Sequence, residues 1–191
     1  LPGSKSTRAD LYYLFSQGWH IDIQALVRRG ASVMGLCGGY QMLGKTISDP
    51  YGVEGKPGVS DGLGLLDVST ILSKDKRLEA VTGEDISSGE LVHGYEMHMG
   101  ITRGPDTERP VLKLTHGTEG ASSINGKVLG SYVHGIFAAD GFRHKFLNHI
   151  LSRSRSSLVW QDKIDETLNH LAEHLEDSLD LDYLLEICRT S

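Results

Sequence analysis

The strongest constraint on the fold is the stretch Val33-Met34-Gly35-Leu36-Cys37-Gly38-Gly39-Tyr40-Gln41-Met42-Leu43. An apolar run ends at Leu36, Cys37 follows, and the residues from Tyr40 onward read as the first turn of a helix. A residue at such a sharp strand-to-helix turn is pushed out of the sheet edge, and small neighbouring residues relieve the crowding. The pattern therefore predicts a nucleophile elbow with Cys37 at its tip.

The chemistry expected of Cys37 follows from this position. A helix N-terminus and a nearby imidazole both favour the thiolate form of a cysteine. The alternative is a buried structural cysteine in a core strand, flanked by glycines that allow a tight turn. We favour the nucleophile, because a purely structural turn has no use for two consecutive glycines and Gln41.

Composition limits the classes of protein to which the chain can belong. Its 191 residues suffice for one domain with a substantial core, and its net charge of -6 leaves no basic footprint for nucleic acid. Two cysteines far apart in the sequence, Cys37 and Cys188, make no disulfide framework and fit a reducing cytoplasm. We find no signal peptide and no apolar run that would span a membrane. Because Leu1-Pro2-Gly3 reads as a strand entering a turn, we expect the carboxy-terminal part of a longer protein.

The order of the elements indicates an α/β fold. Helices are expected before Gly18 and over 19–29, 40–43 and 142–151, and strands over 31–36, 63–70, 91–100, 111–115, 119–124 and 127–133. Asn125-Gly126 is a strong two-residue hairpin signal between the last two strands. Residues 44–62 read as a loop, and residues 72–89 read as polar and peripheral. We predict an open, mostly parallel sheet flanked by helices, with flavodoxin-like layering.

The carboxy-terminal part of the chain is predicted to be a helical extension. Residues 1–151 would form the main domain without its first strands, and residues 152–191 would pack on it after a basic linker. Apolar stripes at helical spacing, one including Leu168 and Leu171, indicate packing rather than chemistry. His170 and His174 enclose Glu173 in an inverted zinc-protease pattern, but no third ligand accompanies them, and a solvated helix face is the better interpretation. We predict no metal site.

Histidine is the usual base for a cysteine nucleophile, and His134 is the best placed of nine histidines. It ends a predicted strand, and the carboxyl ends of strands gather at the sheet edge where Cys37 is expected. Glu96 and His98 alternate onto one strand face and are the second candidates, against the alternative of a solvated face or a salt bridge. An oxyanion would need preorganised N–H donors, which Gly38 and the Gly3-Ser4 turn offer.

Several motifs taken together resemble a known family. They are Pro2-Gly3-Ser4-Lys5, Gly35-Leu36-Cys37-Gly38-Gly39-Tyr40-Gln41-Met42-Leu43-Gly44, Gly62-Leu63-Gly64-Leu65-Leu66, Gly94-Tyr95-Glu96-Met97-His98-Met99-Gly100 and Tyr132-Val133-His134-Gly135-Ile136-Phe137. In this order they resemble class I glutamine amidotransferase domains of the cobyric and cobyrinic acid synthase type, most closely the cobyric acid synthase type. The resemblance runs from the first residue to about Phe146.

The resemblance implies roles for individual residues. Cys37 would be the nucleophile, His134 the base, and Gln41 a contact for the substrate glutamine. Most class I amidotransferases carry a glutamate two residues after the histidine, and this chain has Ile136 there. Some other group or the backbone must hold the imidazole, and Glu96 is one candidate.

The resemblance also implies an activity and partners. The domain would hydrolyse glutamine and pass ammonia to an amino-terminal synthetase domain, which would hold ATP and magnesium; no cofactor is expected in this chain. The corrinoid substrate would be adenosylcobyrinic acid a,c-diamide, amidated to cobyric acid. Alternatives are the glutaminase of cobyrinic acid a,c-diamide synthase or of cell-wall lipid II amidation, or a non-catalytic docking module.

Overall fold

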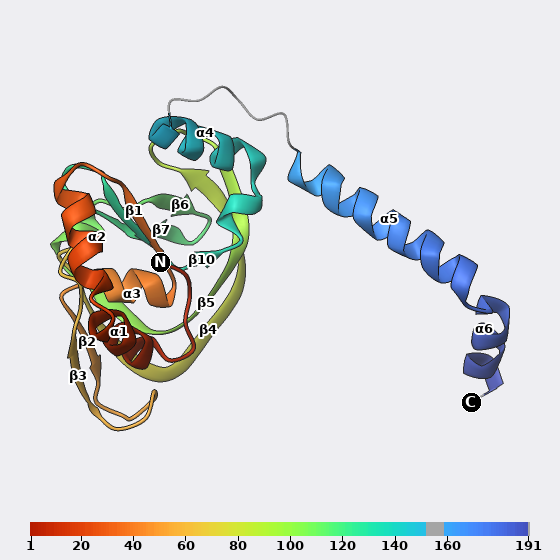
Figure 1. The fold of residues 1–191 in the computed structure, drawn as a ribbon, viewed down its shortest axis with the longest axis horizontal. Helices are drawn as coiled ribbons and strands as arrows, with labels where there is room; N and C mark the ends of the chain where they lie inside the picture. The colour runs from red at the N-terminus through yellow and green to blue at the C-terminus, as the bar shows by residue number, and fades with distance from the viewer. Residues whose placement is uncertain (152–158, 191) are drawn as a thin grey trace. The chain divides into compact units, whose positions relative to one another are not determined.

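The computed structural model describes residues 1–151 and 159–190, and the chain divides into two compact units, Leu1–Arg153 and Ser154–Ser191. Figure 1 shows the elements of both units. The helices of the first unit are α1 (Thr7–Ser16), α2 (Trp19–Arg28), α3 (Gly38–Leu43) and α4 (Asp140–Leu151), with short 3-10 turns η1 (Pro105–Glu108) and η2 (Ile136–Ala138). The second unit contains α5 (Trp160–Ser178) and α6 (Leu181–Thr190).

The strands form two sheets. They are β1 (Val33–Leu36), β2 (Thr46–Asp49), β3 (Gly58–Asp61), β4 (Ser69–Asp85), β5 (Leu91–Arg103), β6 (Leu112–Leu114), β7 (Gly117–Glu119), β8 (Ala121–Ser122), β9 (Val128–Ser131) and β10 (Val133–His134). The smaller sheet has the order β1-β9-β8. The larger has the order β10-β5-β4-β2-β3, and β6 joins it at β4 and carries β7. Figure 1 shows β4 and β5 as one long curved ribbon along a side of the first unit.

The predicted open sheet flanked by helices is present, but it is mixed rather than mostly parallel. In the ranges described, β1 with β9 and β2 with β4 are parallel pairs, and the remaining pairs are antiparallel. The prediction was wrong on this point because it took residues 72–89 for a peripheral region. Residues 72–85 of this stretch belong to β4, which pairs with β5 from Ser69↔Arg103 to Glu84↔Leu91. A hairpin of neighbouring strands is necessarily antiparallel.

Two other segments differ from the sequence-based expectation. The predicted loop 44–62 contains β2 and β3, and the predicted strand 63–70 becomes a strand only at Ser69. In β4 the polar composition hid the strand, since most of its middle residues are exposed and only Leu72, Val81 and Asp85 are buried after Thr70. The long run of exposed polar residues in the middle of β4 leaves no clear apolar period of two.

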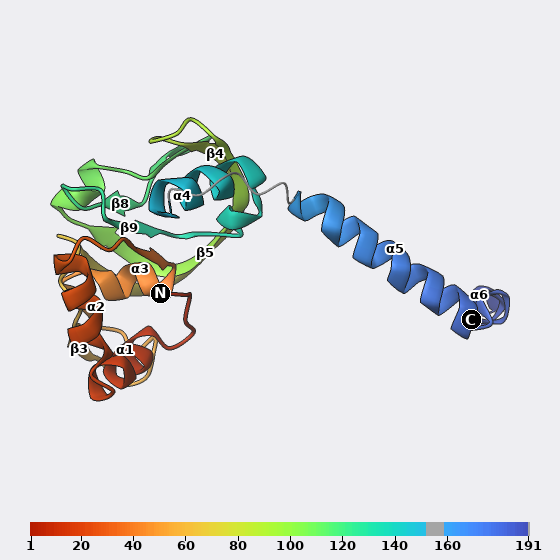
Figure 2. The ribbon, with the colours of Figure 1, turned by 45° about the horizontal axis from the view of Figure 1, so that its top comes forward.

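Two clusters of buried side chains hold the first unit together. One lies around Leu11, Leu43 and Ile47, where α1 and α3 meet the sheets. The other lies around Val133 and Ile136, with side chains from β4, β5, β6 and α4. Figure 2 gives a second view of α1, α3 and α4 beside the strands. The elements that carry Cys37 and His134 are therefore anchored in these cores.

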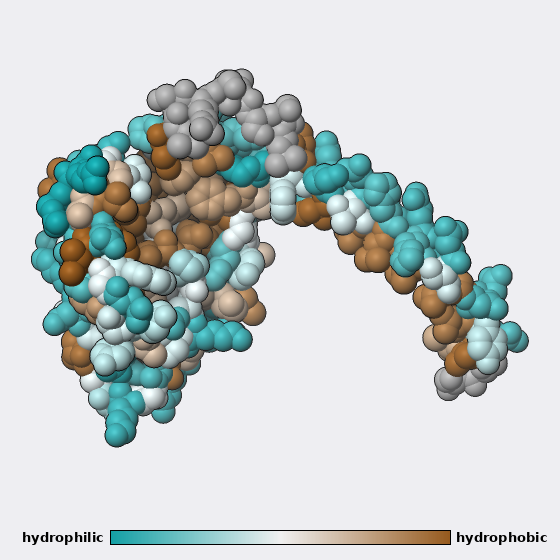
Figure 3. All heavy atoms as spheres, in the orientation of Figure 1, coloured by the Kyte–Doolittle hydropathy of each residue, from teal (hydrophilic) through white to brown (hydrophobic). Residues whose placement is uncertain are grey.

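The second unit confirms the two predicted amphipathic helices. Its apolar side chains Leu168, Leu171 and Leu175 are 44–56% exposed, and Figure 3 shows apolar residues gathered along one side of α5. The predicted linker 152–157 lies outside the described residues, and the packing of the extension on the main domain stays a prediction. No helix in residues 1–151 or 159–190 has the length and apolar character needed to cross a membrane.

Candidate active site

The predicted elbow is present between β1 and α3. Cys37 lies between the last strand residue, Leu36, and the first helical residue, Gly38, with φ 53° and ψ −112°. In the ranges described it is the one non-glycine residue with a positive φ. A side chain in this conformation costs about 1–3 kcal/mol, and such strain gathers at functional sites. The strain makes a purely structural cysteine a poor explanation.

The glycines of the elbow allow close backbone contacts. A Cβ on Gly35 would lie 2.5 Å from the carbonyl oxygen of Gly39, and one on Gly39 would collide with the carbonyl oxygen of Leu1. A Cβ on Gly38 would lie 2.9 Å from the backbone nitrogen of Ser4. The amino-terminal segment therefore lies directly on the start of α3, beside Cys37.

His134 and Cys37 converge on one backbone oxygen. The carbonyl of Met97 in β5 accepts a hydrogen bond from Sγ of Cys37 at 3.2 Å and lies 3.3 Å from Nε2 of His134. A Cβ on Gly3 would lie 3.2 Å from Cε1 of His134 and 3.5 Å from Cβ of Cys37. The thiol, the imidazole and the Gly3 backbone thus surround one small volume.

A cavity of about 750 Å³ opens at this point. Its lining includes nearly all of the residues that the sequence singled out: Gly3, Ser4, Cys37, Gly38, Gln41, His98 and His134. Two lysines, Lys5 and Lys76, also line it, and no aspartate or glutamate does. In the part of the chain that the structure describes, neither lysine makes an ion pair. The cavity is therefore suited to a ligand with a negative charge.

Gln41 is held by a network that the sequence analysis missed. Its Nε2 lies 3.3 Å from the carbonyl oxygen of Met99 and 3.2 Å from the hydroxyl of Tyr132. The Tyr132 hydroxyl in turn bonds Thr102, and burial raises the pKa of Tyr132 to about 12. Tyr132 lies between β9 and β10, two residues before His134, and the motif Tyr132-Val133-His134 is the signal that could have revealed it.

Glu119 fixes the backbone that leads to His134. Its buried carboxylate accepts hydrogen bonds from Oγ of Ser131 and the backbone nitrogen of Tyr132, both at 2.7 Å. Burial raises the pKa of Glu119 to about 7, although these hydrogen bonds act against the shift. No local sequence pattern links Glu119 to His134, because the contact crosses between sheets.

The two other candidates lie apart from each other. His98 lines the cavity, and its ring stacks on Tyr132 with 3.8 Å between centroids; burial, and then the positive charge of Arg77, lower its pKa. Glu96 is buried and does not line the cavity. Its Oε2 lies 2.6 Å from Nε of Arg77 and 3.5 Å from Nε2 of His116. The contact found for the imidazole of His134 is the Met97 carbonyl rather than Glu96.

One group of side chains has the composition of a metal site. Oxygen and nitrogen atoms of Glu79, Glu96 and His116 lie within 4.8 Å of one another. Arg77 already supplies a positive charge there, because it pairs with Glu96 and, at 3.0 Å, with Glu79. A metal ion would have to displace the guanidinium, so these residues form an ion-pair network.

The electrostatics of Cys37 favour the neutral thiol in the resting site. Burial raises the pKa of Cys37, and the nearby Gly38 N–H offsets the shift only in part. Burial penalises the charged thiolate more than the backbone donor supports it. The thiol therefore needs a base at the moment of attack, and His134 is at hand.

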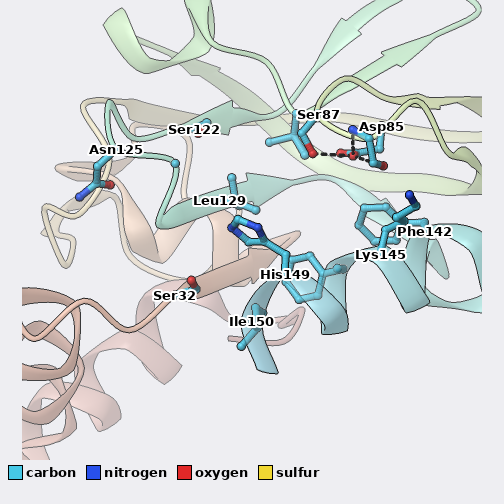
Figure 4. A pocket seen from close by; sticks show the side chains of 14 residues that line it. Ser32, Asp85, Ser87, Ser122, Asn125, Leu129, Phe142, Lys145, His149 and Ile150 are labelled. Atoms are coloured by element: carbon cyan, nitrogen blue, oxygen red, sulfur yellow. Dashed lines mark hydrogen bonds between the residues drawn. The ribbon is translucent and has the colours of Figure 1, made fainter. Parts of the chain in front are cut away.

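A second cavity, of about 650 Å³, lies beside α4 (Figure 4). None of the predicted site residues lines it. The carboxylate of Asp85, which faces it, accepts hydrogen bonds from Ser87 and Ser88, and the rest of the lining includes the apolar side chains of Leu129 and Phe142.

A strained cysteine at an elbow, with a histidine and backbone donors beside it in a mixed α/β fold, is the arrangement that the sequence predicted for a glutamine amidotransferase. CobB/CobQ-like glutamine amidotransferase domains match residues 1–142, and the chain belongs to that family. The predicted resemblance is confirmed. A crystal structure of a glutamine amidotransferase has the same fold, with a TM-score of 0.54 and 20% identity over 80% of this chain and 77% of that one.

Curated relatives are much closer in sequence. Cobyric acid synthase of Cereibacter sphaeroides is 50% identical over 189 residues, and that of Methylobacterium nodulans is 51% identical over 188 residues. The matches cover 99% and 98% of this chain but only 39% and 38% of those proteins, in their carboxy-terminal portion. The matched part includes the helices α5 and α6 as well as the amidotransferase domain.

Proposed function

We propose that this chain releases ammonia from glutamine through a thioester on Cys37 and supplies it for the ATP-dependent amidation of corrin carboxylates. The observation that carries the proposal is the convergence of Cys37 and His134 on the Met97 carbonyl, beside a cavity lined by cations. The names of the relatives favour the conversion of adenosylcobyrinic acid a,c-diamide to cobyric acid over cobyrinic acid diamidation or lipid II amidation.

Glutamine would enter with its side-chain amide at Cys37. Gln41, which lines the cavity, would contact the substrate, and the two lysines Lys5 and Lys76 would suit its α-carboxylate. Met97, beside Cys37, is two positions along β5 from Met99, which pairs with Lys76. That step spans about 6.6 Å, comparable with the length of glutamine from its amide to its carboxylate.

The reaction would begin with proton transfer. His134 accepts the thiol proton while Sγ of Cys37 attacks the amide carbon, and the carbonyl oxygen gains the negative charge. The backbone N–H of Gly38, with that of Gly3 or Ser4, would stabilise this oxyanion. Protonated His134 then donates its proton to the leaving nitrogen, and ammonia departs.

Water completes the cycle. It attacks the glutamyl thioester, His134 accepts a proton from it, and glutamate leaves as the thiol re-forms. Ammonia would pass to a synthetase portion that would hold ATP and magnesium, and the relatives leave room for one because this chain covers only 39% of the first of them. A purely non-catalytic docking module would have no need for the strained conformation of Cys37.

The experiment compares two nitrogen donors. The chain is joined to the amino-terminal portion of the Cereibacter sphaeroides relative, and corrinoid amidation is measured with glutamine and with ammonium salt. His134→Ala should lower the glutamine-dependent rate by about 100-fold or more and leave the ammonia-dependent rate unchanged. His149→Ala, at an exposed histidine of α4, is the matched control and should change neither rate. Loss of both activities in His134→Ala would refute the assigned role.

A further inference from the structure

The ribbon of β4 and β5 has an unusually apolar outer face. Ile71 pairs with Ile101, and Leu78 pairs with Met97. Tyr95 lies two residues before Met97 in β5 and so shares its face. Leu78 is 64% exposed, Ile71 and Ile101 are just over half exposed, and Tyr95 is 42% exposed. We call Ile71, Leu78, Tyr95 and Ile101 the outer apolar face.

The opposite face of the same ribbon is the one that builds the cores. Leu72 and Val81 of β4 are buried there, one in each hydrophobic cluster. An antiparallel sheet with one face on a core normally turns polar residues to water on the other. Lys76 and Met99 lie between the Ile71–Ile101 pair and Leu78, so the apolar residues form two groups on either side of one lysine. Exposed apolar residues gathered on such a face mark a surface that another chain or domain covers.

The outer apolar face borders the active site. The ring of Tyr95 stacks on the imidazole of His134, with 5.0 Å between centroids. The carbonyl of Met97, the residue opposite Leu78, accepts the hydrogen bond from Cys37. A partner that covers this face would therefore sit at the rim of the cavity in which ammonia is released.

We infer that the outer apolar face docks the ATP-dependent synthetase portion of the enzyme. The inference rests on the proposed function and adds the surface through which the two parts meet. The curated relatives continue for more than half of their length beyond the part that this chain matches, so a covalently attached occupant of sufficient size exists in those proteins.

The chemistry of ammonia supports the same occupant. Ammonia that escapes into neutral water is protonated to ammonium, which has no lone pair with which to attack an activated carboxylate. The acceptor site must therefore be sealed against water over the cavity that releases ammonia. The outer apolar face lies beside His134 and offers the non-polar surface that such a seal requires.

The test measures how quickly a thiol on this face reacts. Leu78→Cys and, as the matched control, Ile124→Cys are made in a Cys188→Ser background; Ile124 is 88% exposed beside the Asn125-Gly126 turn and far from the outer apolar face in sequence. Each is treated with a maleimide, and peptide mass spectrometry reads modification at the introduced site separately from Cys37. The chain alone is compared with the chain joined to the amino-terminal portion of the Cereibacter sphaeroides relative.

The chain alone and the joined protein should differ only in the reaction rate of the thiol in Leu78→Cys. In the chain alone, both introduced thiols should react at similar rates. In the joined protein, Leu78→Cys should react at least about tenfold more slowly, and Ile124→Cys should be unchanged. Equal rates at Leu78→Cys in both forms would overturn the inference. So would slow reaction already in the chain alone, because then the helices α5 and α6 or a second copy would cover the face.

A second variant tests whether docking at this face couples glutamine hydrolysis to amidation. Leu78→Glu in the joined protein should lower the ratio of amide product to glutamate released by about tenfold, while Ile124→Glu leaves it unchanged. An unchanged ratio in Leu78→Glu would count against docking at this face. If the joined protein without these substitutions releases no glutamate, the proposed function fails. The maleimide reaction rate of Leu78→Cys tests docking independently of that result.

Discussion

The imidazole of His134 lies parallel to the phenol ring of Tyr95, with 5.0 Å between the ring centroids and 7° between the ring planes. Position 136, where most class I amidotransferases would carry the third member of the triad, holds an isoleucine that is fully buried in the core. The Met97 carbonyl and the Tyr95 ring are therefore the groups that limit rotation of the imidazole. In the proposed mechanism Tyr95 would position the imidazole and take no part in the chemistry itself.

Replacing Tyr95 should impair the rate more than the binding of glutamine. We expect Tyr95→Leu to lower kcat for glutamine hydrolysis by about tenfold with little change in KM, because a misplaced base weakens the transition state and not the ground-state complex. Tyr95→Phe keeps the stacked ring and should restore kcat. Steady-state kinetics of glutamate release provide the measurement, and equal losses in both variants would rule out a role through stacking.

Which of the two cysteines reacts should depend on the reagent. Cys37 is 8% exposed and Cys188 is exposed. A glutamine analogue with an electrophile at the side-chain carbonyl should label Cys37 and spare Cys188, because binding in the cavity delivers it to the nucleophile. A simple alkylating agent should prefer Cys188. Peptide mass spectrometry after each treatment checks this, and equal labelling by the analogue would contradict the assignment of the elbow.

Lys76 should contribute to the affinity for glutamine. We expect Lys76→Met to raise KM for glutamine by about tenfold or more with a smaller effect on kcat, because the α-carboxylate loses a charged partner. Lys74→Met, at an exposed lysine of the same strand that does not line the cavity, is the matched control. Ammonia-dependent amidation should be unaffected by either change. An unchanged KM in Lys76→Met would mean that another group binds the α-carboxylate of glutamine.

The chemistry could be predicted from the sequence because it lies in local patterns. The elbow needs only a strand, a cysteine and two glycines in a row, and the strand end at His134 needs only its neighbours. The sheet order could not be predicted, because the middle of β4 is mostly polar and exposed and leaves no clear apolar period. The contacts of Glu119, Tyr95 and Met97 also escaped, since each joins residues from strands that meet only in the folded chain.

Glu119 should make stability depend on pH. Its pKa is raised from 4.5 to about 7 by burial, so the folded chain binds more protons than the unfolded chain between these values. The free energy of unfolding therefore falls as the pH rises from about 5 to about 7, by about 3 kcal/mol at most. Glu119→Gln removes this charge and should flatten the dependence, whereas Glu108→Gln, at an exposed acid, should not. Thermal unfolding of the parent chain and both variants is measured across this pH range. An identical dependence of stability on pH in all three proteins would refute a raised pKa for Glu119.

Replacing Glu96 tests whether a carboxylate outside the cavity affects the electrostatics of the active site. Arg77, which Glu96 contacts at 2.6 Å, acts on His98, and its positive charge helps to lower the pKa of that imidazole. In Glu96→Gln the charge of Arg77 loses its nearest neutralising partner and weighs more heavily on the cavity. We expect glutamine-dependent amidation to fall more than ammonia-dependent amidation, and less than in His134→Ala, because the Met97 carbonyl still holds the base.

The same substitution should cost stability, because Glu96 is 3% exposed and its loss leaves Arg77 poorly paired. The expected decrease in the free energy of unfolding is about 1–3 kcal/mol. Glu79→Gln is the matched control: Glu79 also pairs with Arg77, at 3.0 Å, but its side chain is 54% exposed, and the cost should be smaller. Chemical denaturation and kinetics with both nitrogen donors are measured on the same preparations. Unchanged glutamine kinetics in a folded Glu96→Gln protein would remove Glu96 from the site and leave it a structural partner of Arg77.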